Sequence, residues 1–210
     1  MLLILGFFLT AILIVLIAIY FAVGKKSKDD DEIIEPKSFA ELNVLDSAVG
    51  DSITIHGAGD SFQDLNFTVD RKDRYEAGGD EWFEVSGRYK GRRVFVEITD
   101  DDDIEVLVNL ANTEITLGDL GMTEEDLVRV DETHDSSVSF SYNNSVWQFE
   151  WSGEIGYFKN CGGEGEGYYN WDFTEKGGSR KISIEKWEDE PFKVILSRNV
   201  NSDDVEVFRS

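Results

Sequence analysis

The sequence Arg92–Asn109, RRVFVEITDDDDIEVLVN, is the stretch from which the fold of this chain can be predicted. Apolar and polar residues alternate on both sides of an acidic run, a pattern typical of two β-strands joined by a turn. The pattern returns 88 positions later, without a gap, as Arg180–Ser197, RKISIEKWEDEPFKVILS. The copies share four identical residues, and apolar residues replace one another conservatively, as Ile182 replaces Val94. We therefore expect an internal duplication.

The segments on either side continue the pattern of short alternating stretches separated by glycine. The expected strands cover residues 52–57, 65–75, 81–89, 92–99, 104–109 and 114–117 in the first half, and 137–142, 145–159, 168–175, 180–187, 192–197 and 203–208 in the second. Five or six strands of about 5–8 residues in each half suit a small barrel or half of a sandwich. The predicted fold class is mainly β, with two tandem small β-barrel or sandwich-like halves after one N-terminal transmembrane helix.

A short helix is expected between the halves. Thr123 and Asp126 have the spacing of a capping box, in which each side chain accepts a hydrogen bond from the other residue's backbone N–H. The apolar residues that can pack behind it are Leu127, Val128 and Val130. The chain then divides into a first β-domain at 45–120, a short helical bridge at 121–136 and a second β-domain at 137–210. Another short helix is expected at 38–45, where Ser38 and Glu41 have capping-box spacing.

Residues 1–23, MLLILGFFLTAILIVLIAIYFAV, contain no charged side chain. A helix needs about 20 apolar residues to cross a bilayer, so Met1–Val23 is expected to be a single-pass transmembrane anchor. Three lysines follow, at 25, 26 and 28, and the positive-inside bias places the soluble part on the cytoplasmic side of the cell membrane. Residues 24–44 are expected to form a flexible charged linker.

A cleaved signal peptide is the alternative, with Ala22–Gly24 as a small-residue cleavage site. No basic residue precedes the apolar run, however, and the run exceeds the usual core of about 7–15 residues. The single cysteine, Cys161, excludes a disulfide within the chain and favours a reducing compartment. An uncleaved anchor is therefore the favoured interpretation.

The chain is strongly acidic, with 43 acidic against 20 basic residues and a formal charge of −23. Nucleic-acid partners are not expected, because binding to phosphates depends on basic groups. The charge can attract metal ions, polyamines or basic protein surfaces, or it can simply keep the surface solvated. The composition leaves these alternatives open.

No residue is nominated as catalytic, cofactor-binding or metal-binding. The acidic run Asp100–Asp103 lacks the alternate spacing and the glycine of a calcium loop, so a solvated turn is expected. Glu97 and Glu185 hold equivalent positions and could in principle form the carboxylate pair of a glycoside hydrolase. They alternate with apolar residues such as Val96 and Ile184, and are therefore expected to point outward into solvent. A non-enzymatic role without a cofactor is favoured, and enzymatic activity is left open.

Aromatic residues beside a glycine-rich acidic loop suggest one ligand surface. Tyr168, Tyr169 and Trp171 could form a stacking surface for a sugar, a base or a cation. Glu164 and Glu166 in the loop would repel phosphate. Aromatic residues that alternate along strands are also common in cores, so burial of these side chains is the alternative.

The features that carry a family resemblance are Val49–Asp51 before an alternating strand, Trp82 with Glu84 before the strand at 92–98, and the later run Ile182–Trp187. In these features the chain resembles the bacterial family named domain of unknown function 4178 over about residues 45–208, with the N-terminal membrane anchor as an addition. The resemblance implies no assigned chemistry. It does imply an association with polyamine-synthase-like, small membrane and envelope-stress proteins.

We expect a membrane-anchored, non-enzymatic β-domain protein that acts as a binding or assembly module at the inner face of the membrane, with envelope stress as one setting. Its partners would be the lipid bilayer, through Met1–Val23, and a protein that the sequence does not identify. The alternative is a binder of cationic small molecules such as polyamines, which both the charge and the family resemblance suggest.

Overall fold

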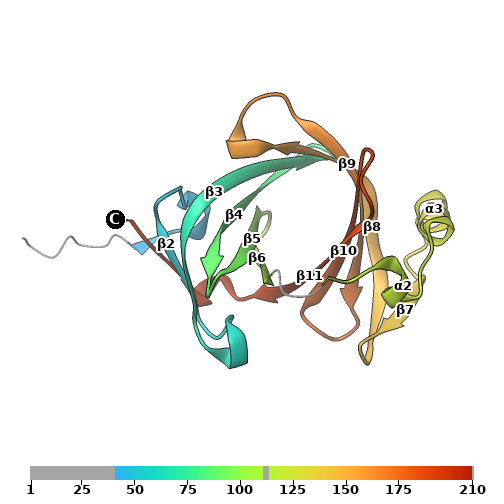
Figure 1. Ribbon diagram of the computed structural model, residues 1–210, viewed down its shortest axis with the longest axis horizontal. Helices are drawn as coiled ribbons and strands as arrows, with labels where there is room; N and C mark the ends of the chain where they lie inside the picture. The colour runs from blue at the N-terminus through green and yellow to red at the C-terminus, as the bar shows by residue number, and fades with distance from the viewer. Residues whose placement is uncertain (1–40, 111–113, 210) are drawn as a thin grey trace, which may run out of the picture. The chain divides into compact units, whose positions relative to one another are not determined.

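The computed structural model describes residues 41–110 and 114–209, which consist mainly of antiparallel β-strands (Figure 1). The strands of the first half are β1 (Glu41–Leu42), β2 (Ser52–Ile55), β3 (Leu65–Ala77), β4 (Asp80–Tyr89), β5 (Arg92–Asp100) and β6 (Ile104–Leu110). Those of the second half are β7 (Ser139–Tyr142), β8 (Ser145–Phe158), β9 (Glu166–Glu175), β10 (Arg180–Trp187), β11 (Lys193–Val200) and β12 (Val205–Phe208). The helices are α2 (Leu117–Leu120) and α3 (Glu124–Thr133), and the 3-10 turns are η1 (Val44–Asp46), η2 (Asp60–Phe62), η3 (Lys159–Cys161) and η4 (Ser202–Asp204). The predicted mainly β fold is confirmed.

The membrane anchor expected from the sequence lies outside the part of the chain that the structure describes. Met1–Val23 and residues 24–40 of the expected linker belong to that outside part. Within residues 41–110 and 114–209, no helix is long and apolar enough to span a bilayer. The described end of the linker does not form the helix expected at 38–45, because β1 pairs with β12 and is followed by η1.

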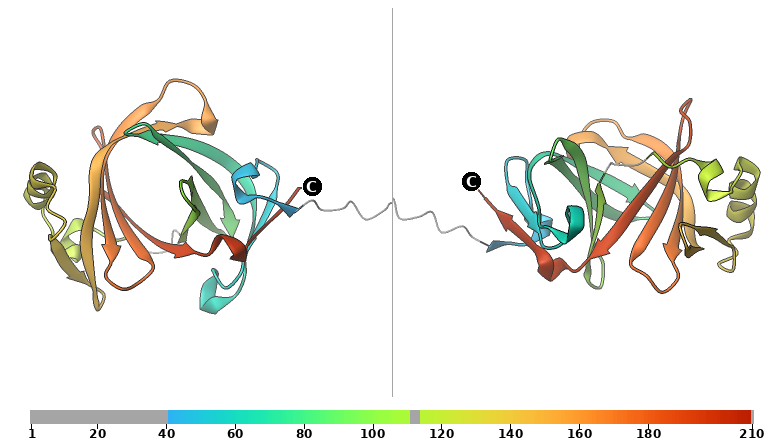
Figure 2. Two further views of the ribbon diagram at one scale, coloured as in Figure 1. Left: turned by 180° about the vertical axis from the view of Figure 1, so that it is seen from behind. Right: turned by 60° about the horizontal axis from the view of Figure 1, so that its bottom comes forward.

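Eight strands form a closed ring in which each strand pairs with the next (Figures 1 and 2). The order around the ring is β3, β4, β5, β6, β11, β10, β9 and β8, and β8 pairs back with β3. Each half of the chain contributes an arc of four strands, β3–β6 or β8–β11. The arcs meet at two short seams, where residues 106–108 pair with 198–200 and residues 74–76 pair with 156–158.

The two halves therefore do not close separately, which corrects the expectation of two tandem barrel-like or sandwich-like halves. An arc of four strands has two edges with unpaired backbone N–H and C=O groups, and the two seams satisfy some of these groups. β12 belongs to the second half of the chain but pairs with β2 and packs on the first arc. Phe39–Ser210 form one compact unit.

The repeat found in the sequence corresponds to equivalent strands, β4–β6 in the first arc and β9–β11 in the second. β5 and β10 match at the offset of 88 residues, with Val94 and Ile182 both fully buried. The pairing registers differ by two residues, because Val85 lies opposite Val96 whereas Phe173 lies opposite Ile182. A shift of two residues keeps each side chain on its own face, so the same face is apolar in both arcs.

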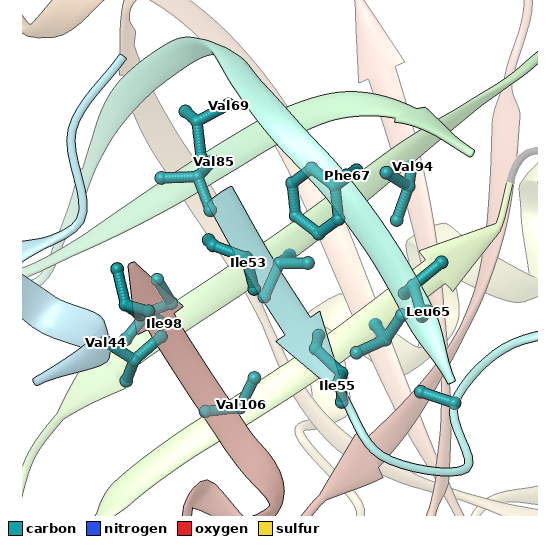
Figure 3. Close-up of a cluster of buried hydrophobic side chains, with 14 of the residues drawn as sticks. Val44, Ile53, Ile55, Leu65, Phe67, Val69, Val85, Val94, Ile98 and Val106 are labelled. Atoms are coloured by element: carbon teal, nitrogen blue, oxygen red, sulfur yellow. The ribbon is translucent and has the colours of Figure 1, made fainter. Parts of the chain in front are cut away.

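The apolar face of the first arc is its outer face, and β2, β12 and η1 cover it. Ile53 of β2 and Phe67 of β3 pack with Val85, Val94 and Val106 of β4, β5 and β6 (Figure 3). These side chains are at most 5% exposed. Burial of each contributes about 1.5–3 kcal/mol, so this cluster fixes β2 and β12 on the arc.

The second arc is covered on its outer face by α2, α3 and β7. Trp147 and Phe173 are fully buried there. Trp171 also faces this cover, and its Nε1–H donates to the backbone carbonyl of Leu127 in α3 at 3.2 Å. Since both outer faces carry the apolar cores, the opposite faces line the interior of the ring.

The helix α3 begins with the capping box predicted from the sequence. Thr123 Oγ1 accepts from the backbone N–H of Asp126 at 3.2 Å, and Asp126 Oδ2 accepts from that of Thr123 at 2.9 Å. Leu127 and Val130 are buried as expected, but Val128 is 48% exposed and points away from the core. The strand expected at 114–117 is reduced to one bridge between residues 115 and 194, after which α2 begins.

A β-bulge in each arc changes the face on which odd-numbered residues lie. The register of β3 shifts between Val69 and Arg71, and that of β8 shifts between Phe149 and Trp151. An extra residue in one strand reverses the alternation that follows it. Val69 therefore belongs to the outer core, whereas Arg71 and the next odd-numbered residues of β3 face the interior of the ring.

Candidate functional site

Three carboxylates lie side by side on the inner face of the first arc. Asp73 of β3 lies directly opposite Glu84 of β4, and Glu84 lies directly opposite Glu97 of β5. Opposite residues of antiparallel strands have Cβ atoms about 4.5–5.5 Å apart, so like charges at these positions repel each other. We call Asp73, Glu84 and Glu97 the carboxylate row.

The equivalent row of the second arc contains a basic residue. Asn170 of β9 lies opposite Glu185 of β10, and Glu185 lies opposite Lys193 of β11. Lys193 Nζ donates to Glu185 Oε2 at 3.0 Å. In the first arc, Leu107 of β6 lies opposite Glu97 instead. The carboxylate row therefore has more acid and less compensating charge than its counterpart.

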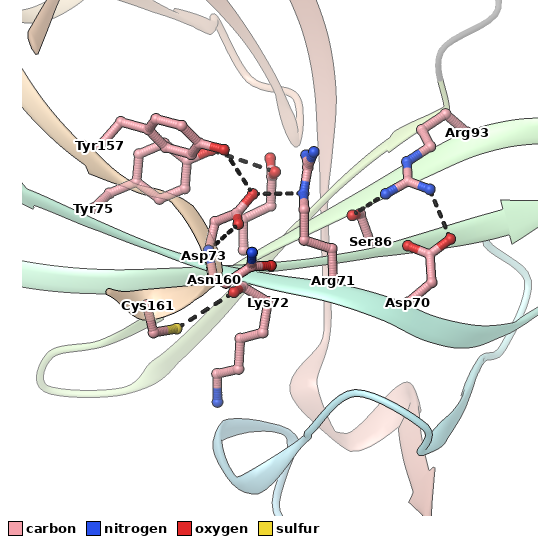
Figure 4. A network of polar contacts seen from close by, with 11 residues as sticks. Asp70, Arg71, Lys72, Asp73, Tyr75, Ser86, Arg93, Tyr157, Asn160 and Cys161 are labelled. Carbon is pink, nitrogen blue, oxygen red and sulfur yellow. Dashed lines mark hydrogen bonds and ion pairs between the residues drawn. The ribbon is translucent and has the colours of Figure 1, made fainter. Parts of the chain in front are cut away.

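Asp73 is the member of the carboxylate row with the most partners (Figure 4). It is fully buried and forms an ion pair with Arg71 Nε at 2.7 Å. The hydroxyl of Tyr157 donates to it at 3.2 Å, and the backbone N–H of Asn160 donates at 2.8 Å. Tyr157 and Asn160 belong to the second half of the chain, so their hydrogen bonds to Asp73 also stabilise the contact between the two arcs at β3 and β8.

Glu84 and Glu97 are far less well compensated. Glu84 accepts one hydrogen bond, from the hydroxyl of Tyr75 at 3.3 Å. Glu97 makes no hydrogen bond or ion pair with any residue that the structure describes. Both side chains are half-buried, so parts of them remain in contact with solvent.

The burial of this pair changes its ionisation. Burial and, to a smaller extent, the charge of Glu97 raise the pKa of Glu84 to about 8, although the charge of Lys193 opposes this shift. Burial also raises the pKa of Glu97, against the opposing effect of Lys181. Glu84 therefore retains its proton at neutral pH in the absence of a cation.

The basic residue whose charge opposes the raised pKa of Glu97 is already engaged elsewhere. Lys181 of β10 forms an ion pair with Asp172 at 2.8 Å, and Asn170 donates to the same carboxylate at 2.8 Å. Burial alone would lower the pKa of Lys181, but the charges of Asp172 and Glu97 outweigh it and raise the pKa. Lys181 thus attracts Glu97 over some distance without neutralising it.

Aromatic side chains line the interior beside the carboxylate row. Their ring centroids are 5.7 Å apart for Tyr75 and Trp82, 5.3 Å for Tyr75 and Tyr157, 6.5 Å for Tyr75 and Tyr168, 5.5 Å for Tyr157 and Trp187, and 4.4 Å for Tyr168 and Trp187. Trp187 Nε1 donates to Glu185 at 2.9 Å. We call these five residues the aromatic cluster. It joins strands of both arcs and provides ring faces next to acidic groups.

The ligand surface expected from the sequence does not form as one patch. Tyr168 belongs to the aromatic cluster, but Tyr169 and Trp171 pack against the outer cover, where the hydroxyl of Tyr169 donates to Asp131. Glu164 and Glu166 are exposed at the loop before β9 and its first residue. Successive residues of a strand point to opposite faces, so neighbours in sequence separate into interior and cover.

The expectation that Glu97 and Glu185 point outward into solvent is wrong. Each points away from its apolar core, as alternation requires, but that direction leads into the ring. Glu185 is only 8% exposed. The arginines near them in sequence pair elsewhere, Arg92 with Asp60 at 2.6 Å and Arg180 with Glu175. The closed ring brings together groups that were expected in separate domains.

The sequence pattern alone does not place Asp73, Glu84 and Tyr75 in one interior. Alternation from Trp82 to Ser86 would have grouped Glu84 with the polar face of β4. Regular alternation from Leu65 would place Asp73 and Tyr75 on the same face as Val69, in the core. The bulge after Val69 reverses the alternation, so both side chains lie on the opposite face.

A second acidic feature is a hollow of about 630 Å³ at the turns after β5 and β11. Its lining includes Asp100, Asp102, Asp103 and Asp203. Within the described residues, no three acidic, histidine or cysteine side chains are grouped closely enough to hold a metal ion. The acids of the interior are likewise spread across strands, which suits an extended ligand better than a point charge.

Comparison with known proteins identifies one family. The model of the family described as Domain of unknown function (DUF4178) matches residues 49–202, which include both arcs of the ring. No curated protein and no solved structure matches the chain.

Proposed function

The chain belongs to the DUF4178 family, and from the charges inside its ring we propose that this protein binds a small organic cation with several amino groups, such as a polyamine. The observation that carries this proposal is the carboxylate row, in which Glu84 and Glu97 face each other without a basic partner in contact.

A cation would relieve the unfavourable electrostatics of this pair. Burying a carboxylate without a partner is costly, and the protein reduces the cost by keeping Glu84 protonated. An ammonium group between Glu84 and Glu97 would stabilise both ionised forms and donate hydrogen bonds to them. Binding of the cation would then be coupled to loss of the Glu84 proton, because the ammonium group stabilises the ionised carboxylate.

The aromatic cluster favours an organic cation over a bare metal ion. Faces of tyrosine and tryptophan attract ammonium groups and pack against the methylene segments between them. Trp82 and Trp187 are half-buried, so parts of their rings are accessible. A linear polyamine could place amino groups at the carboxylates and its carbon chain against the rings.

The charge of the whole chain supports the same ligand class. With a formal charge of −23, the protein attracts cations and repels nucleic acids and other anions over long distances. This field is screened by salt, whereas contacts in the interior are screened less. Selective binding at physiological salt would therefore depend on the ring interior.

In this proposal the ring is a non-enzymatic binding module held at the inner face of the membrane by Met1–Val23. The absence of charge in that segment and the lysines that follow it support this placement. A protein partner that distinguishes the loaded ring from the empty one would make the chain an assembly module, in envelope stress or another setting.

Calorimetric titration of the full-length protein in nanodiscs with spermidine tests the proposal. Saturable heat is expected at about 0.15 M salt. The double variant Glu84→Gln/Glu97→Gln should weaken binding by more than about tenfold, since it removes both uncompensated carboxylates. The matched control Glu164→Gln/Glu166→Gln makes the same change in charge in the exposed loop and should bind like the wild type.

Absence of heat with the wild type at this salt would overturn cation binding and leave the assembly role. If both double variants bind spermidine equally more weakly than the wild type, binding depends only on the net charge of the protein. Either result would contradict a site in the ring interior.

A further inference from the structure

The tip formed by η2 and the turn between β4 and β5 combines an exposed aromatic side chain with basic residues. Phe62 is 85% exposed, the largest exposure among the large apolar side chains that the structure describes as exposed. The adjoining turn has the sequence RYKGRR, Arg88–Arg93, which holds four of the chain's 20 basic residues and no acid. In a chain of formal charge −23, this concentration of positive charge is a local exception.

The backbone holds Phe62 in its outward position. Ser61 and Phe62 have φ values of 54° and 62°, a conformation that is rare for residues other than glycine and least favourable for bulky ones. The N–H of Gly59 donates to the carbonyl of Gln63 at 2.7 Å, and Lys90 Nζ donates to Gln63 Oε1 at 2.8 Å. Conformations of this cost persist where neighbouring contacts enforce them, and they are frequent at functional sites.

Part of the positive charge at the tip is free to meet another anion. Arg92 is committed to Asp60, with Nη2 and Oδ1 2.6 Å apart. Lys90 lies 3.8 Å from the same carboxylate, and its side chain is 51% exposed. Arg88 is exposed and contacts the carbonyl of Gly91 at 3.3 Å. Lys90 shares Asp60 with Arg92 and is held next to the segment of Phe62 by its hydrogen bond to Gln63. Arg88 is exposed at the same turn and pairs with no carboxylate among the described residues.

We propose that this tip docks on the anionic surface of a lipid bilayer, with Phe62 entering the headgroup region and Arg88 and Lys90 contacting lipid phosphates. An aromatic ring is favourable at the membrane interface, and basic residues beside it gain from the negative potential of anionic lipids. Because the chain as a whole carries a large excess of acid, charge complementarity favours this basic tip for contact with such lipids.

One aromatic ring and two basic residues bind a membrane only weakly, so the docking relies on the membrane placement proposed above and not on the cation site. Residues 24–40 can extend by about 3.3–3.6 Å each between the proposed anchor and β1. A tether of that reach keeps the tip at high local concentration near the bilayer, which makes a weak contact effective. Docking would orient the ring relative to the membrane.

A fluorescent label at the tip tests the docking. The full-length variant Ser61→Cys, with Cys161→Ser, carries the environment-sensitive dye NBD in nanodiscs of phosphatidylcholine alone or mixed with phosphatidylglycerol. Emission should rise several-fold with phosphatidylglycerol and fall again in high salt. The same label at Val49→Cys, a residue that is 61% exposed outside the tip, should not respond.

Two further variants in the labelled protein separate docking from misfolding. Phe62→Asn removes the apolar ring and introduces asparagine, which tolerates the positive φ at this position. Arg88→Gln/Lys90→Gln removes the two positive charges. Both should lose the lipid response at an unchanged or higher melting temperature.

Equal emission in the two lipid mixtures, or an undiminished response in Phe62→Asn, would overturn the proposal. Copurification of the chain with nanodiscs tests the proposed membrane anchor, and spermidine binding tests the proposed cation site in the ring. A negative result for docking of the tip can therefore be distinguished from a negative result for either of these proposals.

Discussion

At the scale of single residues, position determines whether a carboxylate is charged. Glu84 and Glu175 are both glutamates at strand positions, yet burial raises the pKa of Glu84 to about 8. Hydrogen bonds from Arg180 and Ser145 lower the pKa of Glu175 to about 2. The difference lies in the partners, because Glu175 has an arginine in contact and Glu84 has only a tyrosine hydroxyl.

The raised pKa of Glu84 predicts a loss of stability with rising pH. Between about pH 5 and 8 the unfolded chain has lost this proton while the folded protein keeps it, so the free energy of unfolding falls as pH rises. Glu84→Gln should remove this loss and stabilise the protein by roughly 4 kcal/mol at pH 8. Urea unfolding of both proteins from pH 5 to 8.5 measures the difference.

His56 changes stability in the same direction in an overlapping window, because hydrogen bonds with Glu206 and Asp64 raise its pKa. It is present in both proteins, so its effect cancels in their difference. Parallel pH profiles for wild type and Glu84→Gln would contradict the assigned burial of Glu84.

At the scale of elements, each arc contains a strand with one face in the apolar outer core and the other face in the polar interior of the ring. β10 places Ile182 and Ile184 in the outer core and Lys181 and Glu185 in the interior. β5 divides its residues in the same way, with Val94 and Val96 outside and Glu97 inside. The apolar face therefore stabilises the sheet, and the polar face supplies the charged groups of the interior.

The outer face of β10 should tolerate truncation poorly. Ile184 is fully buried, and Ile184→Ala should cost roughly 2–5 kcal/mol through lost burial and a residual cavity. The control Val128→Ala removes methyl groups from a side chain that is 48% exposed and should cost less than about 0.5 kcal/mol. Chemical denaturation midpoints compare the two. A cost below about 1 kcal/mol for Ile184→Ala would mean that this face is not tightly packed.

At the scale of the whole molecule, the proposed orientation in the membrane can be tested through the single cysteine. Cys161 is exposed in η3, although partial burial raises the pKa of its thiol. If residues 24–210 face the cytoplasm, a membrane-impermeant maleimide should leave Cys161 unlabelled in intact cells and label it after permeabilisation.

A variant with Cys161→Ser and a cysteine added in a short polar extension before Met1 provides the matched control, because the N-terminal end is expected on the outer side. It should be labelled in intact cells. Labelling of Cys161 in intact cells, or a mature protein that begins near Lys25, would place the ring outside and remove support for the inner-face module.

Much of the local structure could be predicted from the sequence because strands, turns and caps depend on neighbouring residues. Alternation located most strands within a few residues, and Thr123 with Asp126 predicted the start of α3. The match at an offset of 88 residues also identified equivalent strands with a common apolar face. These features follow from side-chain direction and backbone hydrogen bonding within short segments.

The environment of the polar face depended on contacts between distant segments. Alternation shows that Glu97 shares a face with its polar neighbours, but not whether water or another strand lies in front of that face. Pairing of β6 with β11 and of β3 with β8 closed the arcs on each other and turned an apparent outer surface into an interior. The bulge after Val69 then added Asp73 to the carboxylate row, since one extra residue reverses the direction of every side chain that follows it.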